Sequence, residues 1–229
     1  MKNAITPKIS FGMTLTPRPA PVRVMTPGQR LASHPRIQRI GNGKAEIFLV
    51  PDFLMPAGCA ALCDLIEQKR RPSTVANANG DYAFRTSETC DMDARIKVVD
   101  DVQKSICGLL GISRMHAEPL QGQRYAPGQE FKAHSDTFTP GSPDYEKYCS
   151  VSGQRTWTAM AYLDEPQAGG HTVFDRLEID VRPHAGHLLV WNNLLPDGTP
   201  NDATMHHATP VQAGIKRVIT QWFRQREWR

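Results

Sequence analysis

From Pro119 onward the chain is a series of short apolar and aromatic runs separated by glycine and proline, and this pattern restricts the fold more than any other feature. The runs are rich in β-branched and aromatic residues, which is typical of strands. They read LQGQRYAP, RTWTAMAYLD, GHTVFDR, LEIDVRP, HLLVWNN, MHHATPV and KRVITQWFR, with turns such as APG, PGSP, AGG, PHAG, PDGTP and QAG between them. Many short strands at close intervals predict a sandwich or a barrel.

The segment before Pro119 has a different texture. AEIFLV at residues 45–50 predicts a buried strand that Pro51 ends, and Leu62 and Ile66 have helical spacing in the segment that follows. DARIKVVDDVQKSICGLLGI predicts an amphipathic helix that ends at Gly108 or Gly111, and FRTSETCDM before it predicts an extended segment. We therefore expect an α+β fold that is mainly β, with helices first, packed as a brace outside a β-core.

The first 43 residues look like an arm rather than part of this body. Residues 1–39 hold seven basic side chains, no acidic one and six prolines. Removing those seven charges from the formal net charge of +4 leaves about −3 for the rest of the chain. We expect no regular helix in the arm, which either lies extended on the body or docks on an acidic partner. A nucleic-acid surface would have to lie in this arm, because the body is not basic.

Composition narrows the setting in which the protein works. At 229 residues the chain fits one domain with a substantial core, and no apolar run reaches the length of a membrane span. The N-terminus has no apolar signal core, so secretion is not indicated. Five cysteines at irregular spacing argue against a disulfide framework and for a reducing compartment, so we expect a cytoplasmic protein.

The stretch YAPGQEFKAHSD, residues 125–136, carries the first chemical motif. His134 and Asp136 are two apart, so on a strand they project from the same face and can meet one ion. His206 supplies a third ligand, and Lys216 lies ten residues beyond it. One carboxylate and two imidazoles leave open positions on the metal, as is typical of non-haem Fe(II) oxygenases. Taken alone, His134 and Asp136 fit a surface strand with a hydrogen-bonded histidine equally well.

Longer stretches resemble the prolyl 4-hydroxylase-like branch of the Fe(II)- and 2-oxoglutarate-dependent dioxygenases. The resemblance covers roughly residues 47–225. It includes PDFL, FRTSETC, AEPLQGQRYAPGQEFKAHSD, QRTWTAMAYLDEPQAGGHTVF, RPHAGHLLVWNN and MHHATPVQAGIKRVITQWFR. It implies a double-stranded β-helix, or jelly-roll, core at residues 116–226 with a helical brace at 52–115. The dioxygenase domain would then span residues 44–229 and follow an N-terminal arm at 1–43.

The same resemblance implies a ligand set. His134, Asp136 and one of the pair His206 and His207 would hold the iron. The family places its histidine four residues before Pro-Val and ten before a lysine, which selects His206 and leaves His207 behind the site or on the surface. Lys216 would pair with the far carboxylate of 2-oxoglutarate, a sensible partner for a fixed ammonium in a dry cavity.

Tyr125 and Thr158 match positions that hydrogen-bond the cosubstrate, although each equally fits a packing role. The implied cofactors are Fe(II), 2-oxoglutarate and O₂, with ascorbate as reductant. The reaction would release succinate and CO₂ and place a hydroxyl group on an unactivated C–H. A small residue at position 136 would open a halide site, so Asp136 favours hydroxylation over halogenation.

Departures from the family pattern leave the substrate open. Phe131 stands where the family has tyrosine, His171 where it has glutamate, and Arg224 where prolyl hydroxylases carry a histidine near the substrate. Arg155 and Trp222 do match groove residues. A changed set of polar groups changes which substrate groups must be satisfied, so we treat these five positions as determinants of specificity.

Three functions therefore stay open. The first is hydroxylation of a prolyl residue in a peptide or protein, and the second is the same chemistry on a free amino acid or other small molecule. The third is a non-catalytic, metal-binding jelly-roll module. The segment between Thr137 and Gln154 suits either a mobile lid over the mouth of the site or a passive loop. The sequence does not specify the oligomeric state.

Overall fold

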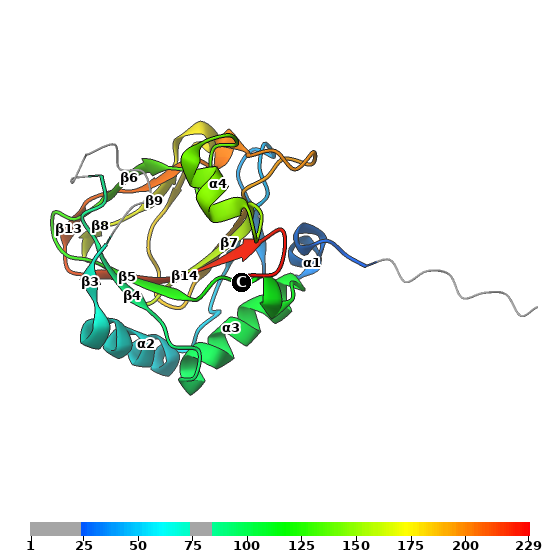
Figure 1. Ribbon diagram of the computed structural model, residues 1–229. Helices are drawn as coiled ribbons and strands as arrows, with labels where there is room; N and C mark the ends of the chain where they lie inside the picture. The colour runs from blue at the N-terminus through cyan, green and yellow to red at the C-terminus, as the bar shows by residue number, and fades with distance from the viewer. Residues whose placement is uncertain (1–23, 74–83) are drawn as a thin grey trace, which may run out of the picture.

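The computed structural model describes residues 24–73 and 84–229, which form two facing antiparallel sheets with helices packed outside the larger one (Figure 1). The larger sheet has eight strands in the order β1-β2-β11-β7-β14-β5-β4-β3. Their bounds are β1 Gln38–Ile40, β2 Ile47–Val50, β11 Leu188–Asn192, β7 Arg155–Tyr162, β14 Lys216–Arg224, β5 Gln121–Tyr125, β4 Glu88–Asp91 and β3 Arg71–Pro72. Non-consecutive neighbours in this order are typical of a jelly roll.

The smaller sheet has four strands in the order β10-β9-β12-β6, and β8 and β13 form a separate pair. The bounds are β10 Ile179–Val181, β9 Thr172–Phe174, β12 His206–Ala208, β6 Phe131–His134, β8 Ala168–Gly169 and β13 Val211–Ala213. The two sheets do not join into a closed barrel. The expected α+β architecture with a jelly-roll core is therefore confirmed.

Strict alternation along the central strands builds one hydrophobic core on each face of the larger sheet. In β11, Leu188 and Val190 pack toward the helices, whereas Leu189 and Trp191 point between the two sheets. This period of two is expected for a strand that is buried on both faces. The face between the sheets is where β14 presents Lys216, so its inward direction follows from the register of the whole strand.

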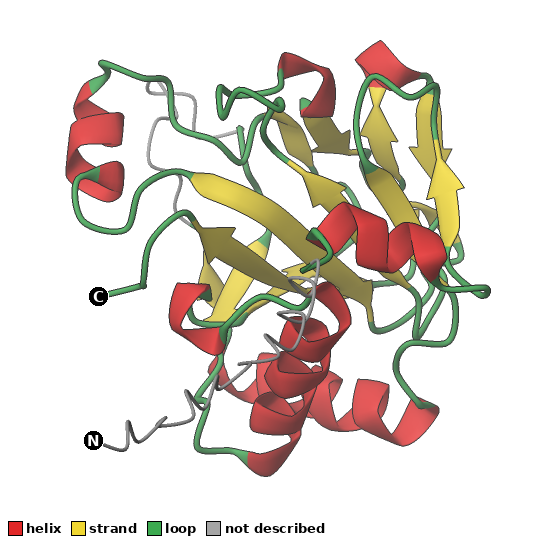
Figure 2. Ribbon diagram, turned by 90° about the vertical axis from the view of Figure 1, so that its right-hand side faces the viewer, coloured by secondary structure: helices red, strands yellow, loops and turns green. Residues whose placement is uncertain are grey.

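Two long helices cover the outer face of the larger sheet (Figures 1 and 2). α2 spans Pro56–Lys69 and buries Leu62 and Ile66, as their spacing predicts. α3 spans Lys97–Leu110 and ends at Gly111, which adopts the left-handed conformation expected of a glycine after a helix. The helical brace and the strand predicted at 45–50 are thus present.

The N-terminal segment departs from expectation. Residues Pro27–Ser33 form a helix, α1, although we expected no regular helix before residue 44. Thr26 and Gln29 form a reciprocal capping box, and Pro27 occupies the first turn, where its missing N–H costs nothing. Leu31 is fully buried in the outer core, and β1 pairs with β2. The expected arm at residues 1–23 lies outside the described residues.

All five cysteines are free thiols, in agreement with the prediction of no disulfide framework. Within residues 24–73 and 84–229, no helix has the length and apolar character that crossing a bilayer requires.

Candidate metal centre and adjoining groove

Three side chains from distant parts of the sequence meet between the sheets. His134 and His206 are directly opposite one another on the neighbouring strands β6 and β12, and their ring centroids are 4.3 Å apart. Asp136 follows two residues after His134 and is buried. One ligand atom from each of the three lies within 4.8 Å of the others, and no other such group of metal-ligating side chains exists among the described residues. This is the geometry of a site for one metal ion.

Backbone carbonyls fix how the two imidazoles face the centre. His134 Nδ1 lies 2.8 Å from the Lys132 carbonyl oxygen, and His206 Nδ1 lies 2.9 Å from that of Thr204. A carbonyl oxygen only accepts, so each Nδ1 carries a hydrogen, and in the neutral form of each ring Nε2 is the nitrogen with the free lone pair. Burial, followed by the charge of His206, holds the pKa of His134 well below its usual range. Both effects favour the neutral, metal-binding form of the ring.

Asp136 is held from the larger sheet. Thr158 on β7 donates a hydrogen bond to its Oδ2 at 2.6 Å and in turn accepts one from Asn193 Nδ2 at 2.8 Å. Burial alone would raise the pKa of Asp136, but the neighbouring histidines, then Arg155 and Thr158, lower it overall. The carboxylate is therefore ionised, as a metal ligand must be.

This arrangement gives Thr158 a different partner from the one expected. Its single hydroxyl hydrogen is donated to Asp136, and the residue does not line the cavity beside the metal centre. We expected either a hydrogen bond to the cosubstrate or a packing role. In the structure the hydroxyl group of Thr158 orients Asp136.

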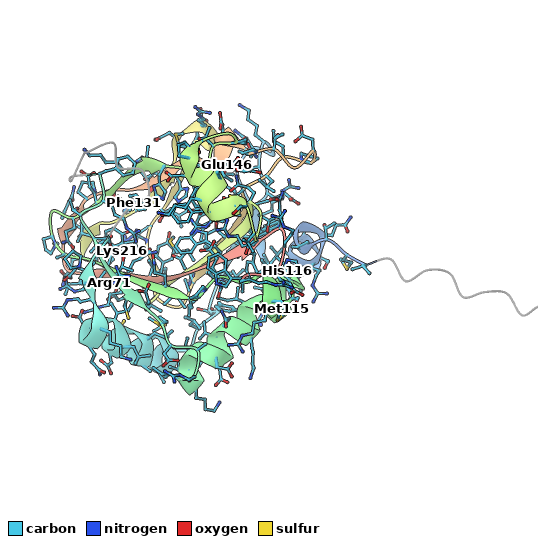
Figure 3. All side chains as sticks on the ribbon, in the orientation of Figure 1. Arg71, Met115, His116, Phe131, Glu146 and Lys216 are labelled. Atoms are coloured by element: carbon cyan, nitrogen blue, oxygen red, sulfur yellow. The ribbon has the colours of Figure 1, made fainter. Side chains whose placement is uncertain are left out.

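A narrow cavity of about 40 Å³ leads from the metal centre to Lys216 on β14. Phe131 and Lys216 line it from opposite sheets (Figure 3). Lys216 is 1% exposed, and its ammonium lies over the rings of Tyr125 and Tyr162 at 5.2 and 5.7 Å. Burial lowers the pKa of Lys216 to about 7, although the charge of Asp164 opposes the shift. No side chain of the described residues forms an ion pair with Lys216, so the cavity suits an anion.

Two indole N–H groups beside the cavity have no partner. The Nε1 atoms of Trp191 and Trp222 are buried and make no hydrogen bond within the described residues. Both side chains line the cavity, and the Trp191 ring stands edge-on to His206 with a centroid separation of 4.9 Å. Buried donors are normally satisfied. The orphaned donors, the neutral imidazoles and the unpaired ammonium together fit a metal ion with a carboxylate-bearing ligand.

Tyr125 lies where the sequence predicted, on the cavity wall opposite β6. It is 3% exposed, and burial raises the pKa of its phenol, so the hydroxyl stays protonated. It pairs directly with Lys216 across β5 and β14. A protonated phenol next to the ammonium offers a second donor for the same anion.

Phe131 forms part of the metal centre's wall. Its ring stacks on His134 with centroids 3.6 Å apart and an interplanar angle of 14°. On its other side, the Arg85 guanidinium lies 4.7 Å from the ring centroid. The apolar ring shields one face of the imidazole and offers no hydroxyl group to a substrate.

A second, larger hollow opens outward from the metal centre. This groove has a volume of about 680 Å³, within the range of pockets that bind extended ligands. Arg155 lies on its wall, with its guanidinium 4.2 Å from the Trp222 ring centroid and 5.3 Å from that of Phe138. Its Nε and Nη2 donate hydrogen bonds to Glu118 Oε1 and Oε2, at 2.7 and 2.9 Å. Arg155 and Trp222 therefore occupy the groove, as expected.

Arg224 also lines the groove, although most of its side chain is buried in the groove wall. Its side chain is 1% exposed, and its Nε lies 2.8 Å from Glu118 Oε1, the carboxylate that also binds Arg155. Nη1 donates to the Gly153 carbonyl at 2.8 Å and Nη2 to that of Tyr148 at 2.9 Å. The contact with Glu118 is an ion pair, because Nε has no hydrogen-bond partner among the described residues, whereas both Nη atoms donate hydrogen bonds to the groove wall.

The segment between Thr137 and Gln154 forms one wall of this groove. It contains a helix, α4, at Pro143–Cys149, which Ser142 caps. The base of the segment is closed by Gln154, whose side chain accepts from Phe138 N and donates to Phe138 O, at 3.0 and 2.7 Å. We expected either a mobile lid or a passive loop. In the structure the two ends of the segment are hydrogen-bonded to each other through Phe138 and Gln154.

The remaining histidines of the motif face away from the centre. His207 points outward from β12 and lies 3.2 Å from Asp175 Oδ2. His171 binds Asp180 at 2.7 Å, on the solvent side of the small sheet. The choice of His206 over His207 therefore agrees with the direction in which each ring points.

Sequence reasoning missed several residues that build the site. Glu118, Asn193, Gln154 and Arg85 carry no local signal, because their partners lie far along the chain. Trp191 could have been found, since alternation in HLLVWNN places it on the same face as Leu189. A buried tryptophan on an inward face calls for a partner to its N–H.

Comparison with known proteins agrees with this geometry. A family model described as the 2OG-Fe(II) oxygenase superfamily matches residues 120–224. The chain is 26% identical over 200 residues to "Probable prolyl 4-hydroxylase 9" of Arabidopsis thaliana, covering 77% of this chain and 68% of that protein. It is 30% identical over 188 residues to the human "Prolyl 4-hydroxylase subunit alpha-1", covering 80% of this chain but 35% of that subunit.

A solved structure shows the same fold. The viral collagen prolyl hydroxylase of Paramecium Bursaria Chlorella virus-1, in its 2OG complex, aligns with a TM-score of 0.61 at 26% identity. The alignment covers 78% of this chain and 95% of the viral one. The fold of this chain is thus shared with a protein whose structure was solved as a 2OG complex.

Proposed function

We propose that the chain is a 2OG-Fe(II) oxygenase that hydroxylates a prolyl residue of a peptide or protein, because the matching family model and the relatives described above agree with the geometry of the site. The observation that carries the proposal is the convergence of His134, Asp136 and His206 at one end of a cavity whose other end holds the unpaired ammonium of Lys216. A metal chelate with a distant carboxylate satisfies both ends at once.

Each residue then has a distinct task. His134, Asp136 and His206 would hold Fe(II), which with 2-oxoglutarate and O₂ would supply the oxidising chemistry. Lys216 binds the far carboxylate, with Tyr125 as a second donor. When bound, the metal, cosubstrate and O₂ supply the oxidation that converts C–H to C–OH and releases succinate and CO₂. Thr158 holds Asp136 as the ligand, and Phe131 and Trp191 exclude water from the centre.

The groove favours a peptide over a small substrate. Its volume of about 680 Å³ is larger than a single amino acid requires, and aromatic rings line it. Phe84, Phe138, Tyr148, Trp222 and Trp228 all contribute. Aromatic-lined grooves suit proline-containing segments, which are extended and lose little entropy on binding. The relatives described above are named for the same substrate class. Hydroxylation of a free amino acid remains the second candidate.

The metal assignment has a direct test. Fe(II)-dependent release of succinate from 2-oxoglutarate should fall at least about a hundredfold in His134→Ala and in Asp136→Ala, because each change removes one of three protein ligands. His207→Ala is the matched control, since this neighbouring imidazole faces outward. Turnover that survives in both ligand variants would contradict the assignment.

The substrate needs a separate experiment. Proline-containing peptides, cell-extract proteins and free amino acids would be incubated with Fe(II) and 2-oxoglutarate and searched by mass spectrometry for the gain of one oxygen. The proposal expects the gain on proline within peptides. A gain confined to free amino acids would favour the second candidate.

Three further parts of the proposal rest on the sequence. Ascorbate would serve as reductant, so its addition should prolong turnover without changing the initial rate. The cytoplasm is the proposed location, since five free thiols suit a reducing compartment. The basic residues before residue 40 would dock on an acidic partner, and their removal should weaken a salt-sensitive association.

A further inference from the structure

Residues 224–226, at the end of β14 and just after it, are extensively hydrogen-bonded to the end of α4 and the segment that follows it. All seven consecutive backbone carbonyls from Tyr148 to Gln154 accept a hydrogen bond from residues 224–226. The Arg224 side chain donates to the carbonyl oxygens of Tyr148 and Gly153. The Arg226 side chain donates to those of Cys149, Ser150 and Val151, at 2.8–3.1 Å. The backbone N–H groups of Gln225 and Arg226 donate to the carbonyl oxygens of Gln154 and Ser152, respectively. We call Arg224, Gln225 and Arg226 the clasp.

The chemistry of the arginine side chains explains why the clasp binds so many carbonyl oxygens. The end of a helix leaves carbonyl oxygens without partners inside the helix, and its partial negative charge favours cations. Two guanidinium groups, each with five N–H donors in a planar fork, meet both needs at the end of α4. Hydrogen bonds from charged donors are stronger than those between neutral groups.

Arg224 also connects this wall to the rest of the groove. Its Nε binds Glu118, which holds Arg155, and Arg155 stacks on Trp222 beside the metal cavity. Guanidinium groups and rings alternate along the wall: Arg155 lies between Trp222 and Phe138, and Arg224 between Phe138 and Trp228, at 4.2–5.5 Å. The carbonyl oxygen of Arg224 lies 3.0 Å from His116 Nδ1.

From these contacts we propose that Arg224 is a positioning residue that determines how the groove binds its substrate. The clasp makes residues 138–154 a permanent wall of the groove instead of a lid. Arg224 sets the wall's distance from the metal centre through Glu118 and Arg155. A preformed wall binds substrate without the cost of ordering a loop, so the clasp acts on substrate affinity and leaves the metal chemistry unchanged.

The test compares Arg224→Lys with Arg229→Lys in the full chain. Lysine keeps the charge of Arg224 but cannot bridge Glu118 and two carbonyls. Arg229 is the matched control, because its side chain is 76% exposed and binds only Glu227 among the described residues. Hydrogen exchange at the amides of residues 143–154 should accelerate about tenfold to a hundredfold in Arg224→Lys, the loss expected for hydrogen bonds from a charged donor. Arg229→Lys should leave it unchanged.

Kinetic measurements distinguish a role of Arg224 in positioning the groove wall from a role in the stability of the whole protein. In Arg224→Lys the KM for the best proline peptide should rise about tenfold, while kcat and peptide-independent succinate release stay within about twofold. If Arg224→Lys does not fold, Arg226→Lys replaces it. Arg226 serves three of the carbonyls without touching Glu118, so exchange at residues 149–151 should accelerate in the same way.

The kinetic part rests on the proposed function, but the exchange part does not. Exchange and KM that both stay at wild-type values in Arg224→Lys would overturn the proposal. So would an equal loss of peptide-dependent and peptide-independent turnover, because that result indicates general destabilisation. If no proline peptide is oxidised yet exchange accelerates as expected, the clasp stands and the proposed substrate is wrong.

Discussion

Lys216 shows how a single residue adapts the site to its ligand. Its ammonium is buried between the sheets, where the described residues offer it two aromatic rings and no ion pair. Burial therefore lowers its pKa to about 7, against a value near 10.4 for lysine in the unfolded chain. In the ligand-free protein the proton is weakly held, and a bound carboxylate would hold it firmly.

The first prediction concerns the pH dependence of this residue. Between pH 7 and about 10.4 the unfolded chain binds a proton that the folded chain has lost, so ligand-free stability rises with pH across this window. Binding of 2-oxoglutarate has the opposite dependence, because it needs the protonated lysine. With Mn(II) in place of Fe(II), affinity should fall by up to about tenfold per pH unit above pH 7.

Titration calorimetry in two buffers with different ionisation enthalpies would measure this affinity and the accompanying proton uptake. Lys216→Met should bind 2-oxoglutarate much more weakly at pH 7 and show no proton uptake. It should also unfold at a higher temperature at pH 6, where the wild-type chain must bury a charge. An affinity that is flat from pH 6.5 to 8.5 would contradict the assigned role.

At the scale of elements, the packing of α2 on β5 keeps Tyr125 and Lys216 in place. Gly122 on β5 faces the helix, and a Cβ atom there would lie 2.6 Å from Ile66 Cγ1 and 2.8 Å from Met92 Cε. The absence of a side chain thus allows helix and strand to approach. Ion pairs reinforce the contact, since Glu67 on α2 binds Arg124 of β5 and Arg217 of β14 at 2.9 and 2.6 Å.

Gly122→Ala should therefore lower the free energy of unfolding by about 1–3 kcal/mol, the usual cost of overpacking a core. Gly58→Ala is a matched control on α2, because its added Cβ would meet no atom within 4 Å. That change should raise stability by about 0.5–1 kcal/mol, since alanine favours a helix. Urea unfolding of both variants measures the effects, and equal values for the two would show that the close approach does not matter.

At the scale of the whole molecule, the site spans two separate sheets. His134 and His206 lie on the smaller sheet, whereas Thr158 and Lys216 lie on the larger one. A metal chelate that also binds Lys216 would link them. Ligands that bind only the folded state raise its stability, and a ligand that bridges two parts should depend on both.

Mn(II) and 2-oxoglutarate together should therefore raise the unfolding temperature by more than the sum of their separate effects. Thermal unfolding with each ligand alone and with both would measure the difference. Asp136→Ala should lose the joint effect, and His207→Ala should keep it. Stabilisation by 2-oxoglutarate alone that equals the joint effect would exclude a shared site.

Much of the fold could be read from local pattern. The alternation in RTWTAMAYLD and HLLVWNN predicts strands, and the spacing of Leu62 and Ile66 predicts α2, because period and turn chemistry are properties of neighbouring residues. The capping box of α1 is also visible in TPGQ, although the surrounding prolines favour an arm without a helix. The metal-ligating types and their order were visible for the same reason.

Contacts between distant segments were beyond the sequence. Nothing near Thr158 indicates that its hydroxyl serves Asp136, and nothing near Arg224 indicates that it joins Glu118 to the end of α4. These roles depend on which strands lie side by side, and the two strand orders are set by burying the whole apolar surface at once. The sequence by itself determined the chemistry available to the site, because that resides in residue types and spacing. The tertiary structure decided which partner each side chain has, because only folding brings distant donors and acceptors within hydrogen-bonding distance.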